Sequence, residues 1–522
     1  MDGIPKQEQF DVVIVGSGAS GSIVAAKAAE AGKSVLILEA GPERKLNDLT
    51  SSQIWARRQK WNGAPVEEEG DLKITHAFNA GYGTGGSAMH HYAVWPRLHE
   101  NDFNVFSEHG KSLDWPIAYK DLQPYYDQVQ AEVGISGDAK AEKWRPEGAA
   151  YPLPAMPTFA QGNVIAKGFE KMGMRTSPIP LAINSQPYND RKSCLYDGWC
   201  DAGCPIGALA NPLVVYLPQA FKAGAKIRHN ATVVRVLHDP AGKKATGVEY
   251  VDADGVRKVV LGKHIVLAAF VVQNARLLLA SQSDKFEQGL ANNHDMVGRY
   301  LTAHPSNYVF GMFADETQPF LGATGGQVMC QDNYDDKAAV ENAFGSYQWL
   351  AALAVKSNDL LGFANTRPDI FGAALEPFLK RAAKNFGSMV CVGEDVSSPD
   401  NRITLSENKD KYGVPLAKAV HNIAPESAQM LAAAVVQGKA VFEAAGAEEA
   451  WSAPPFAMHN MGGTVMGTKA ENSVTDSYGR THELDNLFIV GPGVFPTSGA
   501  VNPTFTIHAL ALRSVQEMLA TA

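Results

Sequence analysis

The amino-acid sequence predicts an α/β fold, and two observations support this prediction. An apolar run at residues 10–15 leads through a glycine-rich turn into an alanine-rich helical stretch at 23–31, and a second apolar run follows at 34–38. This order is that of a βαβ unit of about 30 residues. The chain has 522 residues, which is more than one hydrophobic core usually supports. We therefore expect a Rossmann-like domain at the N-terminus and a second domain beside it.

The glycine-rich turn has the spacing of a dinucleotide-binding fingerprint. Gly16 is expected to form the tight turn, Gly18 to let the backbone approach a pyrophosphate, and Gly21 to allow close packing of helix on strand. Ala19 and Ser20 lie between the last two glycines, where the N-terminus of the helix faces the phosphates. The sequence therefore predicts a nucleotide-binding site at this turn.

Glu39 ends the second apolar run, eighteen residues after Gly21. An acidic side chain at this strand end accepts hydrogen bonds from the ribose hydroxyls of a bound nucleotide. Glu39 therefore predicts an unphosphorylated ribose and argues against NADP.

The remaining elements are less regular. We expect a hairpin of strands at 232–237 and 246–250, a buried strand at 265–269, and helices at 273–281 and 426–445. Residues 140–190 are rich in proline and lack periodicity, so an irregular surface connection is expected there.

Composition argues against several classes of function. There are 46 Lys and Arg residues against 55 Asp and Glu, a net charge of −9 and no dense basic run, so nucleic acid is not an expected partner. The longest apolar run, at 265–272, is far shorter than the ~20 residues that a membrane helix needs, so no membrane span is expected. The first residues lack the basic and apolar regions of an export signal, which by itself predicts a cytoplasmic protein.

Three parts of the sequence resemble the glucose-methanol-choline (GMC) oxidoreductases: the opening βαβ unit, the segment 85–91, and the tail from 459 through 501–504. Residues 114–126 also resemble a stretch that recurs in the bacterial sugar and gluconate dehydrogenase branch of that family. The resemblance implies that the nucleotide is FAD rather than NAD. It implies a discontinuous Rossmann-like FAD-binding domain at 1–95, 190–300 and 455–522, and a substrate domain, built on an antiparallel sheet with helices, that takes in 96–189 and 301–454 with connecting segments.

The resemblance also implies the reaction. The family oxidises a CH–OH group by hydride transfer to the flavin, and His459 and Asn502 match its catalytic His and Asn. Such a reaction needs a base for the hydroxyl proton and a polar group that holds the oxygen, and a neutral imidazole suits reversible proton transfer. His508, six residues after Asn502, is interpreted as structural. We expect a sugar, sugar acid, glycoside or related alcohol as the substrate.

Further cofactor contacts follow from the same motifs. By position, the resemblance assigns to FAD binding Gly85, Gly86, His90, Val233, Asn502, Pro503 and Thr504. Some family members attach the flavin covalently at the position of His90, but Ala88, Met89 and His91 differ from the residues usual there, which argues against a covalent bond. Phe270 stands where the family normally has glycine, and its bulk is expected to narrow the cavity near the cofactor.

Cys194, Cys200 and Cys204 fall within one segment of eleven residues, and this segment is a loop that contains glycines. Three thiolates can hold an iron–sulfur cluster, and the spacing resembles that of dehydrogenase-branch members with a three-iron, four-sulfur cluster. The alternatives are a structural zinc ion, which would need a fourth ligand, a disulfide, or unligated thiols. Cys330 and Cys391 are isolated and are expected to be buried apolar residues.

The resemblance also bears on partners and compartment. Catalytic subunits of the dehydrogenase branch lack an export signal, reach the periplasm folded with a small signal-bearing subunit, and pass electrons to a cytochrome. The chain is expected in the periplasm if such a partner carries it. Two alternatives stay open: an oxidase that uses oxygen with the same pair of residues, and a non-catalytic flavoprotein that only relays electrons. The intact pair of His459 and Asn502 argues against the relay, which needs no base.

Overall fold

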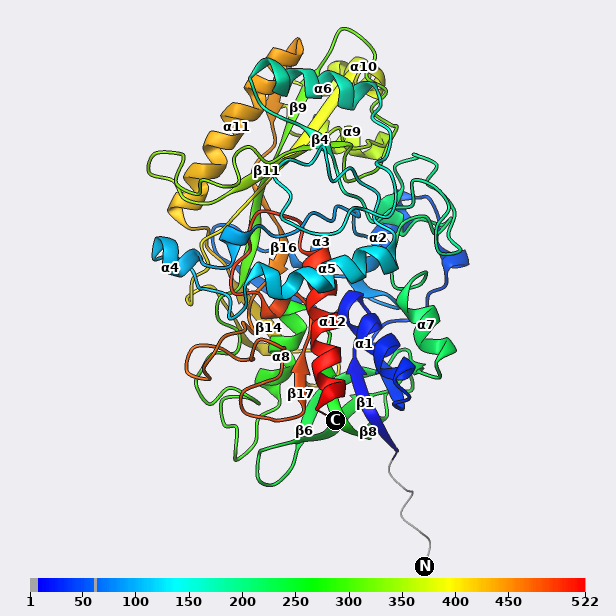
Figure 1. Cartoon of the computed structure of the whole chain (residues 1–522), viewed down its shortest axis with the longest axis vertical. Helices are drawn as coiled ribbons and strands as arrows, with labels where there is room; N and C mark the ends of the chain where they lie inside the picture. The colour runs from blue at the N-terminus through cyan, green and yellow to red at the C-terminus, as the bar shows by residue number, and fades with distance from the viewer. Residues whose placement is uncertain (1–7, 61–62, 522) are drawn as a thin grey trace, which may run out of the picture.

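The structure is a computed structural model that describes residues 8–60 and 63–521. One seven-stranded sheet occupies the lower half of the view in Figure 1 and a second occupies the upper half. The α-helices of the described residues are α1 (Ala19–Glu30), α2 (Gln53–Arg58), α3 (His76–Asn79), α4 (Val105–His109), α5 (Tyr119–Val133), α6 (Ala160–Lys171), α7 (Tyr216–Lys222), α8 (Val271–Ala280), α9 (Ser357–Ala364), α10 (Leu375–Asn385), α11 (Pro425–Ala445) and α12 (Thr504–Ala520).

The lower sheet contains the predicted βαβ unit. Its strands are β1 (Gln9–Val15), β2 (Val35–Leu38), β5 (Lys226–Arg228), β6 (Thr232–His238), β7 (Ala245–Val251), β8 (Arg257–Leu267) and β17 (Leu487–Ile489). β1 pairs in parallel with β2 and β8, whereas β6, β7 and β8 are antiparallel neighbours, which confirms the expected hairpin. All four residues of β2 are buried, as in a parallel sheet covered on both faces. The sheet thus combines three segments that are far apart in the sequence.

The turn after β1 requires two of its glycines for packing. Gly16 has a φ of +103°, and a Cβ there would lie 2.5 Å from the carbonyl oxygen of Ala268, just after β8. A Cβ on Gly21 would lie 2.2 Å from the carbonyl oxygen of Gly16. Any other side chain would therefore separate α1 from the strands that it covers. Helix α1 also packs beside α12 (Figure 1).

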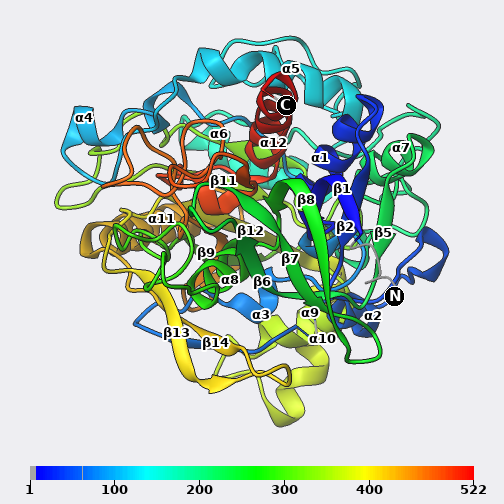
Figure 2. The same ribbon diagram turned by 90° about the horizontal axis from the view of Figure 1, so that it is seen from below.

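The upper sheet is antiparallel. Its strands are β4 (Ser177–Pro178), β9 (Thr302–Met312), β10 (Val328–Cys330), β11 (Tyr347–Ala351), β12 (Phe386–Gly393), β15 (Glu449–Ser452) and β16 (Phe456–Met461). Helix α11 packs on β9 and β12 and contacts α6. A smaller sheet of β3 (Val66–Glu69), β13 (Arg402–Lys409) and β14 (Pro415–Val420) lies beside the lower sheet, with β13 and β14 visible in Figure 2.

The prediction that residues 140–190 are irregular is wrong at α6. This helix buries Gln161, Ile165, Gly168 and Phe169, which share one face. Two of its residues are glycines and one buried residue is polar, so the apolar pattern is weak and the intrinsic helix propensity is low. Packing decides the outcome, because a Cβ on Gly168 would lie only 2.3 Å from the carbonyl oxygen of Val441 in α11.

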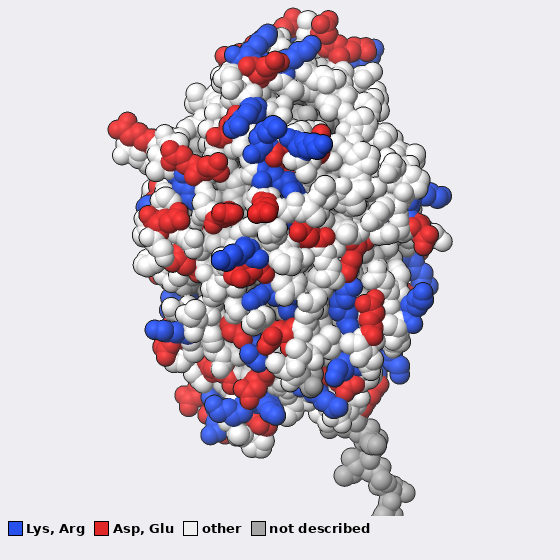
Figure 3. Space-filling view, viewed as in Figure 1, with Lys and Arg blue, Asp and Glu red and all other residues white. Residues whose placement is uncertain are grey.

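The charged side chains of the surface show no strong segregation by sign on the face that Figure 3 presents. On the face shown in Figure 3, acidic and basic side chains are interspersed, and no continuous basic stripe crosses it. Across residues 8–60 and 63–521, no helix combines the length and the apolar character needed to cross a membrane.

Candidate functional site

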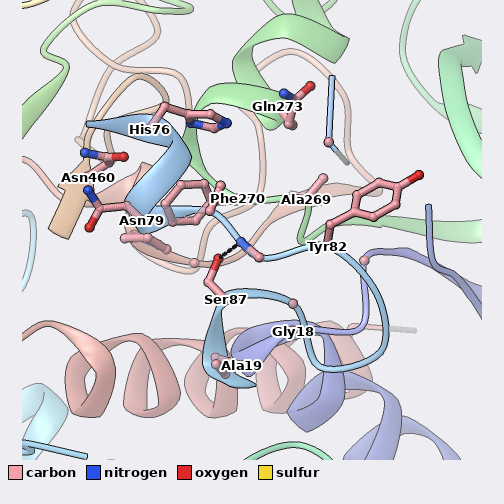
Figure 4. A pocket seen from close by; sticks show the side chains of 18 of the residues that line it. Gly18, Ala19, His76, Asn79, Tyr82, Ser87, Ala269, Phe270, Gln273 and Asn460 are labelled. Atoms are coloured by element: carbon pink, nitrogen blue, oxygen red, sulfur yellow. Dashed lines mark hydrogen bonds between the residues drawn. The ribbon is translucent and has the colours of Figure 1, made fainter. Parts of the chain in front are cut away.

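A cavity of about 810 Å³ is lined by residues of both seven-stranded sheets. Its walls include the turn at 15–20, the segment 86–88, residues 458–460 and the start of α12 at 502–504. Figure 4 shows part of this wall, with Gly18 and Ala19 at the beginning of α1. The volume lies in the upper part of the range for cofactor and small-molecule sites.

Most positions assigned to the cofactor line this cavity. They are Gly16, Gly18, Ala19, Ser20, Glu39, Gly86, His90, Val233, Asn502, Pro503 and Thr504. Gly21 lies against Gly16 instead, and Gly85 donates its N–H to Ser17 Oγ at 3.1 Å. Gly21 and Gly85 therefore shape the wall without forming its surface.

Glu39 is held at the end of β2 by three hydrogen bonds. Its carboxylate accepts the N–H of Ser17 at 3.1 Å, the hydroxyl of Ser17 at 2.6 Å and the N–H of Gly41 at 2.9 Å. A carboxylate has about four acceptor positions, so one is left for a ribose hydroxyl. The buried carboxylate is thus held at the cavity wall with one acceptor position free.

Two helices begin at the cavity wall, α1 at Ala19 and α12 at Thr504, and neither has a side-chain cap. The N–H groups of a first helical turn have no partner within the helix and carry partial positive charge. A Cβ on Gly18 would meet only the carbonyl oxygen of Gly85, at 3.8 Å, so the space beside this residue is open. The turn therefore fits a pyrophosphate group.

His459 lies in a β-bulge. Strand β16 pairs with β9 at Met458–His304 and again at Met461–Thr302, so β16 has one extra residue between these pairs. His459 has a φ of +60°, a left-handed conformation that costs a non-glycine residue about 1–2 kcal/mol. Bulges re-aim side chains, and this one directs the imidazole of His459 to the cavity.

The partners of His459 determine which of its nitrogens is protonated. Its Nδ1 lies 2.9 Å from Nδ1 of His304, and Nε2 of His304 lies 3.1 Å from the carbonyl oxygen of Ser498. A carbonyl only accepts, so Nε2 of a neutral His304 holds the proton and its Nδ1 accepts the N–H of His459. Nε2 of His459 is then unprotonated, and it accepts from Nδ2 of Asn502 at 3.3 Å. The geometry places a basic nitrogen at the cavity.

Burial keeps both rings neutral. It lowers the pKa of His304 from 6.5 to about 4. Burial, reinforced by His304, also lowers the pKa of His459 well below its ordinary value. Because desolvation penalises the charged form, His459 is available as a base throughout the neutral pH range.

Asn502 is fixed from its other side by a chain of amides. Its Oδ1 accepts from Nε2 of Gln348 at 3.2 Å, and Oε1 of Gln348 accepts from Nε2 of Gln331 at 3.0 Å. Oε1 of Gln331 lies 3.3 Å from Nε2 of His99. With His99 as the first donor, every donor points the same way, towards Asn502 and His459. A flipped Asn502 would lose both of its bonds, so the chain selects the orientation in which Asn502 donates to the base.

Two further residues at the wall bear on the cofactor. Nε2 of His90 is buried and has no hydrogen-bond partner among the described residues, which fits contact with a bound ligand. Phe270 has a φ of +72° and a ψ of 165°, a region almost confined to glycine. The centroid of its ring lies 6.1 Å from the centroid of the His76 ring. Both residues line the cavity and are labelled in Figure 4.

The sulfur atoms of the cysteine loop each accept a backbone N–H. The donors are Tyr196 to Cys194 at 3.3 Å, Thr324 to Cys200 at 3.4 Å and Leu209 to Cys204 at 3.4 Å. Burial is the main cause that raises the pKa of Cys194 to about 11 and of Cys200 to about 12, and the neighbouring thiols contribute. Cys200 is buried, whereas Cys194 and Cys204 are half-buried.

The alternatives for these cysteines can now be compared. All five cysteines are free thiols, so no disulfide forms, and Cys330 and Cys391 are buried as expected. Within the described parts of the chain, no three or more His, Cys, Asp or Glu side chains are arranged to hold a metal ion. A single-ion site such as structural zinc therefore finds no support in this arrangement.

Several site residues could not be found from sequence motifs. His304 and Gln348 belong to strands of the middle segment, where no nucleotide motif occurs. Asn79, which accepts the N–H of His459 at 3.1 Å, belongs to the short helix α3. The available signal was polarity at alternate positions of an otherwise apolar strand, as at His304 and Ser306 in β9.

Known protein families and relatives match most of this chain. Models described as GMC oxidoreductase match residues 10–306 and residues 397–511. The fructose dehydrogenase large subunit of Gluconobacter japonicus is 28% identical over 98% of this chain and 97% of that protein. The 2-methyl-1,2-propanediol dehydrogenase of Mycolicibacterium austroafricanum is 31% identical over 97% of this chain and 94% of that protein. The structure of pyridoxine 4-oxidase from Mesorbium loti matches with a TM-score of 0.67 and 18% identity, over 97% of this chain and 98% of that chain. This likeness shows the fold alone.

Proposed function

This chain belongs to the GMC oxidoreductase family, and we propose that it is an FAD-dependent dehydrogenase that oxidises a CH–OH group of an alcohol or sugar to a carbonyl. The observation that carries the proposal is the unprotonated Nε2 of His459 beside the amide of Asn502, at the cavity wall. His459 is the proposed base and Asn502 the group that holds the substrate oxygen.

The two residues divide the work on the substrate hydroxyl. Nε2 of His459 accepts the hydroxyl proton while the carbinol C–H bond breaks. Nε2 of His459 has a single lone pair, so its bond from Asn502 must give way when it accepts the substrate proton. The amide of Asn502 then donates to the substrate oxygen and thereby orients the carbinol carbon. His304 holds the ring of His459 in one tautomer. FAD, when bound, accepts the hydride.

The residues that would hold FAD follow from the geometry of the cavity. Glu39 offers its free acceptor position to the adenosine ribose, and the first turn of α1 faces the pyrophosphate. His90 also lines the cavity, and Asn502 at the start of α12 contacts His459. The partial positive charge at the beginning of α12 favours negative charge there.

Anaerobic reduction of the bound flavin tests the function. Addition of alcohols and sugars to the yellow holoprotein should bleach the flavin, because hydride transfer fills its electron-accepting state. The reduced protein should then reoxidise slowly in air and rapidly with an artificial electron acceptor. Rapid reoxidation in air would identify an oxidase. A flavin that no alcohol or sugar reduces would contradict the proposal and favour the electron relay.

We propose further that Cys194, Cys200 and Cys204 hold an iron–sulfur cluster near the flavin. The N–H donors to all three sulfurs support this, because such hydrogen bonds tune clusters held by thiolates. A multi-iron cluster distributes its cysteines over several metal atoms, so it does not need the convergent ligands of a single ion. When bound, such a cluster carries single electrons, as a cytochrome acceptor requires.

Exposed apolar side chains surround the cysteine loop and support a docking partner. Leu195, next to Cys194, is 64% exposed, and Phe320, whose carbonyl faces Gly198, is 54% exposed. Ile54, which is 64% exposed, lies on α2 against the turn at Cys200. We propose a cytochrome or a small signal-bearing subunit as the partner at this surface, and the second of these would carry the chain to the periplasm.

Substitution of Cys200 by serine tests the cluster. Anaerobic protein made with ample iron should contain iron and acid-labile sulfide, and Cys200→Ser should lose most of both, because a hydroxyl is a poor iron ligand here. The variant should keep substrate-driven flavin reduction but transfer electrons more slowly to an acceptor. Cys330→Ala, which alters an isolated buried thiol, is the control and should retain the iron. Absence of iron and sulfide from the parent protein, with normal turnover of Cys200→Ser, would show that these thiols are structural.

A further inference from the structure

The cavity wall opposite the nucleotide turn is one face of the upper sheet. Tyr308 in β9 pairs with Val390 in β12, which pairs with Leu350 in β11, and all three line the cavity. Paired residues of antiparallel strands share a face, and so do residues two or four apart along a strand. Gln348 and His304, which hold the catalytic pair, therefore lie on this same face. The wall is thus the surface that a substrate at His459 contacts.

This wall is uncharged, and its polar residues at the cavity are Tyr308, His459 and Asn460. Besides Leu350 and Val390, it includes Leu353 and Met458. Charged residues of the cavity lining, among the residues that the structure describes, are Glu39, Arg276, Lys409, Asp410 and Lys411. Glu39 belongs to the nucleotide end, and Arg276 on α8 binds Asp410 in the turn between β13 and β14. Lys409 and Lys411 belong to the end of β13 and the turn that follows it, in the smaller sheet. In the described chain, no cation of the upper sheet therefore lines the cavity where the carboxylate of a sugar acid would need one.

Two tyrosine hydroxyls supply polar groups at this part of the cavity. Burial raises the pKa of Tyr92 and of Tyr308, so both hydroxyls are uncharged at neutral pH. Both tyrosines line the cavity. Both hydroxyls are available to a substrate.

From this wall we infer that the substrate is an uncharged alcohol with an apolar body and one distal hydroxyl that binds Tyr92 and Tyr308. The inference rests on the proposed dehydrogenase function and narrows its substrate class. A sugar has a hydroxyl on nearly every carbon, and each one buried without a partner weakens binding roughly 5- to 150-fold. Tyr308, Leu350, Leu353 and Val390 lie between the two segments matched by the family models, where this chain's own specificity can arise.

Two series of matched alcohols test this inference. The probes are butan-1-ol, butane-1,4-diol, erythritol and 4-hydroxybutanoate, and hexan-1-ol, hexane-1,6-diol and sorbitol. In at least one series the diol should have a kcat/KM, measured with an artificial acceptor, more than tenfold above that of the polyol. The kcat/KM of butane-1,4-diol should also be more than tenfold above that of 4-hydroxybutanoate. Tyr308→Phe should reduce kcat/KM for the diol more than for the mono-alcohol, because it removes the partner of the distal hydroxyl.

The control is Tyr347→Phe. Tyr347 lies on the opposite face of β11, where its hydroxyl donates a hydrogen bond to Gln437. This variant should leave the ratio of diol to mono-alcohol unchanged. A preference for erythritol, sorbitol or the anion, or an unchanged ratio in Tyr308→Phe, would overturn the inference while the dehydrogenase function stands. Failure of every alcohol and every sugar to reduce the flavin would instead contradict the proposed function itself.

Discussion

Replacement of His459 by alanine is expected to slow flavin reduction by substrate about 10²- to 10⁴-fold, the usual contribution of a general base. Alanine leaves the substrate proton without an acceptor, while Asn502 keeps its bond to Gln348 at 3.2 Å. The cofactor contacts of α1 and Glu39 are untouched, so the variant should purify with FAD. Anaerobic stopped-flow measurement of flavin absorbance gives the rate directly.

Asn502→Ala is the comparison for this experiment. Asn502→Ala should slow flavin reduction less than His459→Ala does, because it removes an orienting hydrogen bond and leaves the base. The pH dependence provides a second check. Protonation of His459 abolishes its function as a base, and its pKa is held well below 6.5, so the reduction rate should fall only at pH values well below 6.5. A His459→Ala rate within a few-fold of the parent rate would disprove the assignment.

Replacement of Gly18 by valine is expected to yield folded protein without FAD. A Cβ at this position meets only one protein atom within 4 Å, the carbonyl oxygen of Gly85 at 3.8 Å, so the isopropyl group enters the open cavity where the pyrophosphate would bind. The fold should persist, because no backbone lies in the way. Flavin content after purification, together with circular dichroism and thermal unfolding, measures both effects.

Two other glycines make this result specific. A Cβ on Gly362 in α9 would meet nothing within 4 Å, so Gly362→Val should keep the flavin. Gly21→Val should instead destabilise the fold, since its Cβ would lie 2.2 Å from the carbonyl oxygen of Gly16. If Gly18→Val purifies fully yellow and active, the cofactor does not occupy the proposed position.

Much of the nucleotide end could be predicted from local patterns. Gly16, Gly18 and Gly21 have their roles because the turn, the ligand approach and the helix contact all occur within six residues. Glu39 follows from the strand that it ends. Helix α6 could not be predicted in this way, because its stability comes from packing on α11 rather than from its own residues.

The sequence by itself determined the family and the dinucleotide fold, and it singled out His459 and Asn502 as the proposed catalytic pair, since these inferences depend on short motifs. Only the tertiary structure decided how the pair is held and what it faces. His304 is 155 residues from His459 and Gln348 is 154 residues from Asn502, so no local pattern joins them. The pairing register of β9, β11 and β12 places their side chains on the face that also carries Tyr308, Leu350 and Val390. A shift of one residue in any of these strands would turn its side chains to the other face, which is why the polarity of the substrate wall is a property of the folded sheet.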